Sequence, residues 1–213
     1  MTGAALDRGA LLRRGLRLEV FTVGWNVLEA IVAITAGVMA GSVALVGFGL
    51  DSVIESISGV ALYHRLRSEV VAGNEEGNEA RERRALYFVG ISFFLIGAYV
   101  LYEAATGLLE REQPGHSGIG IALAVVSLIV MPVLGLSKLR TARQLGSRAL
   151  AGDAKETFVC SYLSLALLLG LGLNSWLGWW WADAVAGLAM LPLIIQEGWE
   201  AIEEAREDDE HAH

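Results

Sequence analysis

Two pairs of side chains with metal-binding chemistry share one spacing. Asp51 and Glu55 are four residues apart, and so are Glu156 and Cys160. Residues at this spacing lie one turn apart on the same face of a helix. Carboxylates and thiolates both bind Zn²⁺, and a thiolate shifts preference from Mg²⁺ and Ca²⁺ toward softer transition metals. Two helices with two donors each would supply a tetrahedral set of ligands, so these residues are the predicted metal site.

The segments that carry these pairs are too apolar for an ordinary soluble protein. Of the 213 residues, 54% are hydrophobic and only 19% are charged, and the mean hydropathy is +0.49. The net charge of −8 repels a phosphate backbone, which argues against a nucleic-acid partner. The single cysteine excludes an intrachain disulfide framework. The composition therefore indicates a protein whose partner is the lipid bilayer.

The hydropathy pattern predicts an all-α polytopic membrane protein with six transmembrane helices. A membrane helix needs about 20 mostly apolar residues. The first such stretch is too long, and with Asn26 and Glu29 too polar, for a cleaved signal peptide. The stretches that qualify are 18–40, 43–64, 85–109, 117–137, 157–176 and 178–198.

Short turns and basic residues predict how these helices are connected. The turns at 40–42 and 174–178 favour helical hairpins for the first two and the last two spans. Of the 16 Lys and Arg residues, only Arg111 falls on the side opposite the chain ends. The positive-inside rule then predicts that both termini lie in the cytoplasm, and the membrane is predicted to be the cell (inner) membrane. Segment 65–84 is predicted to be a flexible loop, and the basic segment 138–155 a helical extension into the fifth span.

Acidic residues inside the spans need a cationic partner. Ionisable side chains in a bilayer are costly and face the bundle interior or a water-filled cavity. No basic residue lies within the apolar part of either span that carries a predicted pair, so protons or a metal ion must compensate. Asn26 and Glu29 share one face of the first span and form a second tier, as outer partners or a second cation position. Asp153 is either interfacial or a further ligand, and Asp183 is expected to cap its own helix.

Several of these motifs together resemble a known family. The run from Asn26 through Gly41-Ser42-Val43-Ala44-Leu45 to Asp51-Ser52-Val53-Ile54-Glu55-Ser56 is similar to the first two membrane helices of the cation diffusion facilitator, or cation efflux, transporters. Residues 152–164, followed by Gly178 and 182–187, resemble their helices five and six. The likeness extends over residues 15–200. It implies proton-coupled efflux of a divalent metal by a homodimer that works by alternating access.

The resemblance also implies a site and a domain organisation. The family's site uses an acid or His and then Asp in helix two, and His and then Asp in helix five. The matching positions here are Asp51 and Glu55, then Glu156 and Cys160, so an imidazole is lost and a thiol gained. Zn²⁺ is the favoured substrate, with Co²⁺, Cd²⁺, Fe²⁺ and Mn²⁺ left open. The expected organisation is a cytoplasmic N-terminal segment (1–17), a six-helix transport domain (18–199) and an acidic cytoplasmic tail (200–213). The family's usual C-terminal metal-binding domain is not expected.

Other functions remain open at this point. A membrane protein that binds metal without moving it, such as a sensor or a modulator of another transporter, would need the same ligands. A channel would pass ions without proton coupling, although buried acid pairs bind too tightly for fast flow. An enzyme is not expected, because the spans contain no Ser and His pairing for nucleophilic catalysis.

Overall fold

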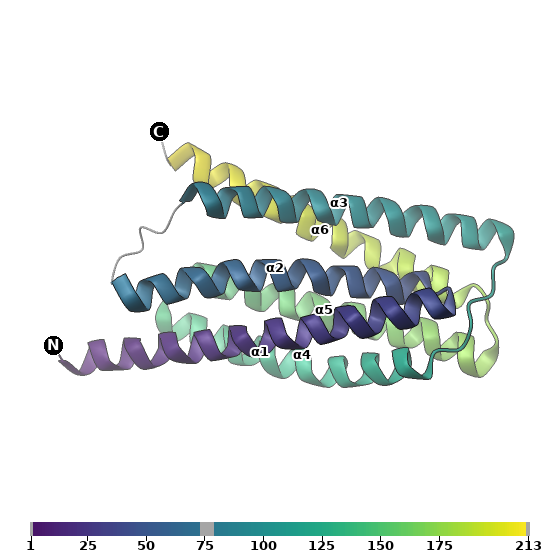
Figure 1. Cartoon of the computed structure of the whole chain (residues 1–213), viewed down its shortest axis with the longest axis horizontal. Helices are drawn as coiled ribbons and strands as arrows, with labels where there is room; N and C mark the ends of the chain where they lie inside the picture. The colour runs from purple at the N-terminus through teal and green to yellow at the C-terminus, as the bar shows by residue number, and fades with distance from the viewer. Residues whose placement is uncertain (1, 73–78, 212–213) are drawn as a thin grey trace.

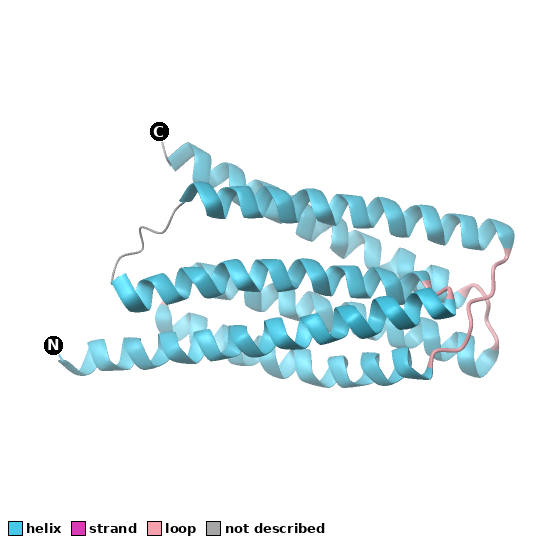
Figure 2. Cartoon of the chain, in the orientation of Figure 1, coloured by secondary structure: helices cyan, strands magenta, loops and turns pink. Residues whose placement is uncertain are grey.

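The described part of the chain, residues 2–72 and 79–211, is built from helices joined by short connections (Figure 2). This computed structural model confirms the predicted all-α class and the six helices long and apolar enough to cross a membrane. The helices are α1 (Thr2–Ala40), α2 (Val43–Ala72), α3 (Glu79–Glu110), α4 (Gly118–Leu145), α5 (Arg148–Leu177) and α6 (Ala182–His211).

The helices are longer than the apolar stretches that predicted them. Most of the predicted loop 65–84 is helical, because α2 continues to Ala72 and α3 begins at Glu79; residues 73–78 lie outside the described residues. Segment 138–155 is also not one extension, since α4 ends at Leu145. Polar residues continue a helix once it has left an apolar environment, so hydropathy marks the membrane-embedded part and not the helix ends.

A glycine and a serine divide segment 138–155. Gly146 has φ of 69°, a left-handed conformation that glycine adopts without steric cost, and its N–H donates to the Ala142 carbonyl. Ser147 then caps α5, since its side chain accepts a hydrogen bond from the Leu150 N–H. The prediction of a helical lead into the fifth span is therefore right from Arg148 onward and wrong before it.

The helices pack as a group of four with a pair beside it. In Figure 1, α1, α2, α4 and α5 lie together, and α3 and α6 run side by side along one flank. The start of α1 and the end of α6 lie at the end of the bundle that also holds the end of α2, the start of α3 and the α4–α5 connection (Figure 1). The predicted hairpins α1–α2 and α5–α6 are confirmed as packed neighbours. The transport and tail boundaries at residues 18 and 200 remain predictions, since α1 and α6 run through them without a break.

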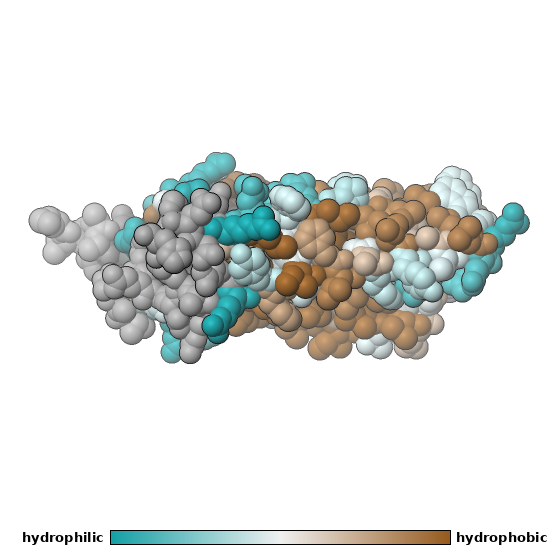
Figure 3. Space-filling view, turned by 90° about the horizontal axis from the view of Figure 1, so that it is seen from above, coloured by the Kyte–Doolittle hydropathy of each residue, from teal (hydrophilic) through white to brown (hydrophobic). Residues whose placement is uncertain are grey.

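The outer surface is apolar along the middle of the bundle. Figure 3 shows one face, with hydrophobic residues between more polar regions toward the two ends. Large exposed apolar side chains include Ile31, Leu95, Tyr102 and Ile129. An apolar exterior, with the ionisable side chains kept inside the bundle, is the arrangement expected for helices surrounded by lipid.

Asp183 joins two helices at the end of the bundle away from the termini. It does not cap its own helix, as the sequence suggested, but the start of α2. Its carboxylate, only 2% exposed, accepts hydrogen bonds from the Ser42 hydroxyl (2.5 Å) and the Val43 N–H (2.8 Å). The first N–H groups of a helix have no partner within it, so a carboxylate placed there satisfies them and favours the positive end of the helix dipole.

Replacing Asp183 by Ala is expected to lower the free energy of unfolding by about 2–4 kcal/mol, because charge-assisted hydrogen bonds are lost and buried donors are left without partners. Thermal unfolding in detergent, followed by circular dichroism, measures the effect. Glu112→Ala is the matched control, since Glu112 is an exposed acid in the α3–α4 connection at the same end. Equal unfolding temperatures for the two variants would contradict this role of Asp183.

Candidate metal centre

Helix α2 presents two carboxylates to the interior of the bundle. Asp51 and Glu55 are 3% and 8% exposed, and their spacing places them one turn apart on the buried face of α2. Ser52 and Ile54 beside them are also buried, so the carboxylates lie within packed protein and not against lipid. Two buried carboxylates so close together repel each other unless a cation or protons lie with them.

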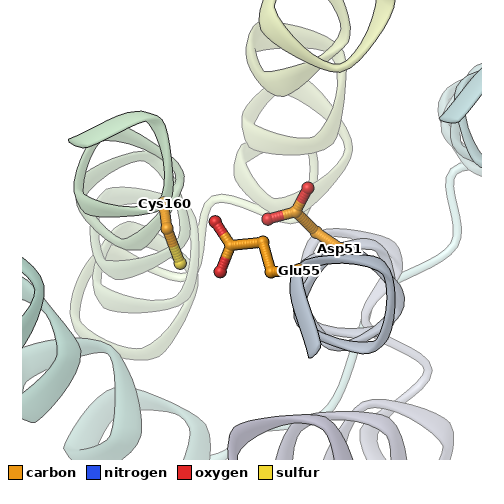
Figure 4. Close-up of side chains that lie close together, drawn as sticks. All are labelled: Asp51, Glu55 and Cys160. Carbon is orange, nitrogen blue, oxygen red and sulfur yellow. The ribbon is translucent and has the colours of Figure 1, made fainter. Parts of the chain in front are cut away.

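Helix α5 brings a thiol to the same place. Cys160 is fully buried, and one ligand atom from each of Asp51, Glu55 and Cys160 lies within 4.8 Å of the others. Figure 4 shows the Glu55 carboxylate and the Cys160 sulfur pointing toward each other across the space between α2 and α5, with the Asp51 carboxylate beside them. Ligand atoms around tetrahedral Zn²⁺ are roughly 3.3–3.6 Å apart, from typical metal–ligand distances. Rotamer adjustments of about 1 Å would bring these three atoms to that separation.

Asn26 of α1 supports this cluster. Its side-chain N–H donates a 2.9 Å hydrogen bond to Glu55 Oε2, and the residue is fully buried. Among the described residues, neither the Asn26 side-chain oxygen Oδ1 nor Asp51 Oδ2 has a hydrogen-bond partner. Unpartnered buried oxygens are costly, which indicates that the cluster is arranged for a ligand that supplies positive charge.

Glu156 lies near the cluster but outside it. It is not among the residues whose ligand atoms come within 4.8 Å of one another. Its Oε2 instead accepts a 3.2 Å hydrogen bond from the Ser58 hydroxyl of α2. Glu156 precedes Cys160 by one turn and Ser58 follows Glu55 by one turn, so this contact lies one turn closer to the end with the chain termini. The structure therefore brings Asp51, Glu55 and Cys160 together and leaves Glu156 one turn away.

Glu29 is hydrogen-bonded to α4, and among the described residues it makes no hydrogen bond to Asp51, Glu55 or Cys160. The Ser127 hydroxyl donates to Glu29 Oε1, and Glu29 Oε2 has no hydrogen-bond partner in the part of the chain that the structure describes. Glu29 is fully buried and lies three residues after Asn26 on α1. Of the two second-tier residues on α1, Asn26 thus contacts the cluster directly, and Glu29 extends the acidic interior along the same face.

Asp153 belongs to a different cluster. Its Oδ2 lies 2.5 Å from Lys138 Nζ, and the Lys138 ammonium also lies 3.3 Å from Glu19. The sequence predicted that Asp153 is either an interfacial acid or a metal ligand, and neither prediction includes this ion pair with Lys138. Lys138 is the first residue of the basic segment 138–155 that follows the fourth predicted span, but its side chain is fully buried. Among the residues that the structure describes, it is the only buried basic side chain.

Two further buried acids escaped the sequence analysis, Glu19 of α1 and Glu197 of α6. A signal for Glu19 was present, because the buried polar residues of α1 recur at helical spacing. Extending the face of Asn26 and Glu29 toward the N-terminus reaches Glu19, two turns earlier. That face is Glu19, Thr22, Asn26 and Glu29.

Comparison with known proteins identifies the fold and its class of function. Residues 20–208 match the cation efflux transmembrane domain. Transmembrane protein 163 of Xenopus laevis is 24% identical over 87% of this chain and 65% of its own length. A probable cation efflux system protein of Mycobacterium tuberculosis is 26% identical over 85% of this chain and 54% of its own length. The manganese efflux system protein MneS of Bacillus subtilis is 20% identical over 94% of this chain and 70% of its own length.

The chain spans somewhat more than half the length of the first two of these relatives. The part that is matched includes all the residues of the clusters described above except Glu19, which immediately precedes it. Six apolar helices with buried acids, and a domain match over most of the chain, lead to one conclusion. The chain is an integral membrane protein and belongs to the cation efflux family of transporters.

Proposed function

We propose that this protein moves a divalent transition metal ion across the membrane and binds it at Asp51, Glu55 and Cys160. The observation that carries the proposal is the convergence of two buried carboxylates from α2 and one buried thiol from α5 within 4.8 Å. Glu156, one turn from Cys160 on α5, is the proposed fourth ligand, reached by a change of its side-chain rotamer. Zn²⁺ is the favoured substrate because it accepts oxygen and sulfur ligands in a tetrahedral set.

Other divalent metals remain candidates. Co²⁺, Cd²⁺ and Fe²⁺ accept the same mixed donors, and one relative is named a manganese efflux protein. A thiolate ligand argues for a softer ion than Mn²⁺. The proposed order of preference therefore starts with Zn²⁺ and Cd²⁺.

The same residues suggest proton exchange. Carboxylates and thiols bind metal only after they lose their protons, so metal binding releases protons and protonation releases metal. Movement of one helix group relative to another would expose the site to each side in turn, and the α3–α6 pair beside the group of four is the natural division. The distribution of basic residues favours a location in the cell (inner) membrane, with both termini on its cytoplasmic side. The family resemblance favours a homodimer.

Purified protein reconstituted into proteoliposomes tests this function. Vesicles with an acidic lumen and a metal-sensitive dye inside should take up external Zn²⁺ and lose their pH gradient as they do so. A metal-binding protein that modulates another transporter would bind Zn²⁺ in detergent but leave the dye signal at the level of empty vesicles. A channel would admit Zn²⁺ equally with and without the pH gradient. Either result would overturn proton-coupled transport.

Zn²⁺ affinity is expected to fall as pH falls. At pH values where the donors are protonated in the free protein, each proton that Zn²⁺ displaces should raise the dissociation constant roughly tenfold for every pH unit of acidification. Isothermal titration in two buffers of different ionisation enthalpy gives the number of protons released. Glu69→Gln is the control, since Glu69 pairs with Arg8 at the bundle end and not at the site. An affinity independent of pH would exclude proton release from these ligands.

A further inference from the structure

A buried ion cluster joins three helices between the metal centre and the end that holds the chain termini. Lys138 of α4 lies 2.5 Å from Asp153 of α5 and 3.3 Å from Glu19 of α1. The Lys138 and Glu19 side chains are fully buried, and that of Asp153 is 10% exposed. We call these three residues the Lys138 triad.

The triad lies two helical turns from the metal centre, toward the end of the bundle that holds the chain termini. Asp153 precedes Cys160 by seven residues on α5, and Glu19 precedes Asn26 by seven residues on α1. Seven residues are two turns, or about 10 Å along a helix. Glu156 lies between the two clusters on α5. Glu156 thus provides an acidic side chain between the triad and the metal centre.

The two carboxylates of the triad are arranged as cation ligands. They come from separate helices and converge on a single positive atom, the Lys138 ammonium nitrogen. Lys138 Nζ donates a 3.3 Å hydrogen bond to Glu19 Oε2, whereas Glu19 Oε1, also 3.3 Å from this nitrogen and buried, has no hydrogen-bond partner among the described residues. One ammonium leaves the triad with a net charge of −1, whereas a divalent ion in its place would neutralise both carboxylates. The flexible lysine stem lets the ammonium leave and return.

We propose that Glu19 and Asp153 form a second, transient position for a divalent cation, which the Lys138 ammonium fills when no metal is there. This inference rests on the proposed function and extends it to a second position on the path. A metal ion that arrives from the end with the termini displaces the ammonium, binds the two carboxylates, and passes by Glu156 to the centre. Lys138 then returns behind it and opposes its loss by the same route.

Metal binding to a variant without the central ligands tests the second position directly. In the background Asp51→Asn with Cys160→Ser, adding Lys138→Met should make the detergent-purified protein bind one further Zn²⁺ ion per chain in equilibrium dialysis. Adding Glu19→Gln should remove that ion again. A properly folded Lys138→Met protein that binds no more Zn²⁺ than the background would overturn the proposal.

A second variant guards against loss of folding. Lys138→Met leaves two buried carboxylates without their partner, which can destabilise a protein strongly. Glu19→Gln alone keeps the neutral Lys138–Asp153 pair. It should raise the KM for Zn²⁺ transport about tenfold, while the equilibrium affinity of the centre changes much less. Glu69→Gln, which removes an ion pair between α1 and α2 at the same end, is the matched control.

The outcomes separate the two proposals. An unchanged KM in Glu19→Gln, with a lower unfolding temperature only, would make the triad a purely structural ion cluster and overturn the second position. If the wild-type protein moves no Zn²⁺ in vesicles, the transport function fails, and the dialysis experiment still decides whether Glu19 and Asp153 hold a metal ion.

Discussion

Asp51→Asn is expected to reduce Zn²⁺ transport by at least about 100-fold, since even changes to residues that only support a metal ligand lower affinity 10–100-fold. Asparagine has nearly the shape of aspartate but lacks the charge, so the effect isolates the carboxylate. Asp51 is buried, and its Oδ2 has no hydrogen-bond partner in the described structure. Initial rates of Zn²⁺ uptake in proteoliposomes, at matched protein content, measure the loss.

The same substitution should leave the fold intact or stabilise it. A buried carboxylate without a partner is unfavourable, and its replacement by a neutral amide removes part of that cost. For a chain of this length, each kcal/mol gained would raise the unfolding temperature by about 2–4 °C. A variant that is at least as stable as the wild type but does not transport would identify Asp51 as a residue whose stability cost serves function. Wild-type transport rates in this variant would refute the site assignment.

Cys160→Asp is expected to change which metal is preferred. A carboxylate in place of the thiolate makes the donor set harder, so the ratio of Mn²⁺ to Cd²⁺ transport should rise by about tenfold or more. Competition between Cd²⁺ and Mn²⁺ for uptake into the same vesicles measures the ratio directly.

Cys160→Ser is the matched control for this substitution. Serine keeps the size of the side chain but is a weak metal ligand, so it should lower transport of every metal without favouring the harder ions. Thiol labelling gives a further measurement, because the chain has a single cysteine. Bound Zn²⁺ should protect Cys160 from a thiol reagent in the wild type. An unchanged order of metals in Cys160→Asp, together with no protection, would remove the thiol from the site.

The buried charges suggest how transport and stability are balanced in this bundle. The interior holds several acids and, among the described residues, one buried base, Lys138. Lipid-facing surfaces cannot compensate such charges, so the interior must do so with hydrogen bonds, protons or metal ions. Asp183 is satisfied by the start of α2, whereas the Asp51 and Glu55 carboxylates are not satisfied to the same degree. This contrast separates a structural acid from the two acids that we propose bind the metal ion.

The sequence by itself determined the membrane class, the helices and the end of the bundle that holds the termini. Long apolar stretches and the unequal distribution of basic residues between the connections carry that information locally, because each helix contacts lipid along its own length. The spacing of four residues also showed that Asp51 and Glu55 share a face. The exact helix ends were not determined, because polar residues continue a helix beyond the apolar region and only Gly146 and Ser147 mark the break between α4 and α5.

Only the tertiary structure decided which faces meet. Periodicity shows that two side chains share a face, but not how a neighbouring helix is rotated or shifted along its axis. A shift of one turn separates Cys160, which joins the cluster, from Glu156, which contacts Ser58 instead. The pairing of Asp153 with Lys138 and the capping of α2 by Asp183 likewise join helices that are distant along the chain. Such contacts depend on packing between helices, which no single segment specifies.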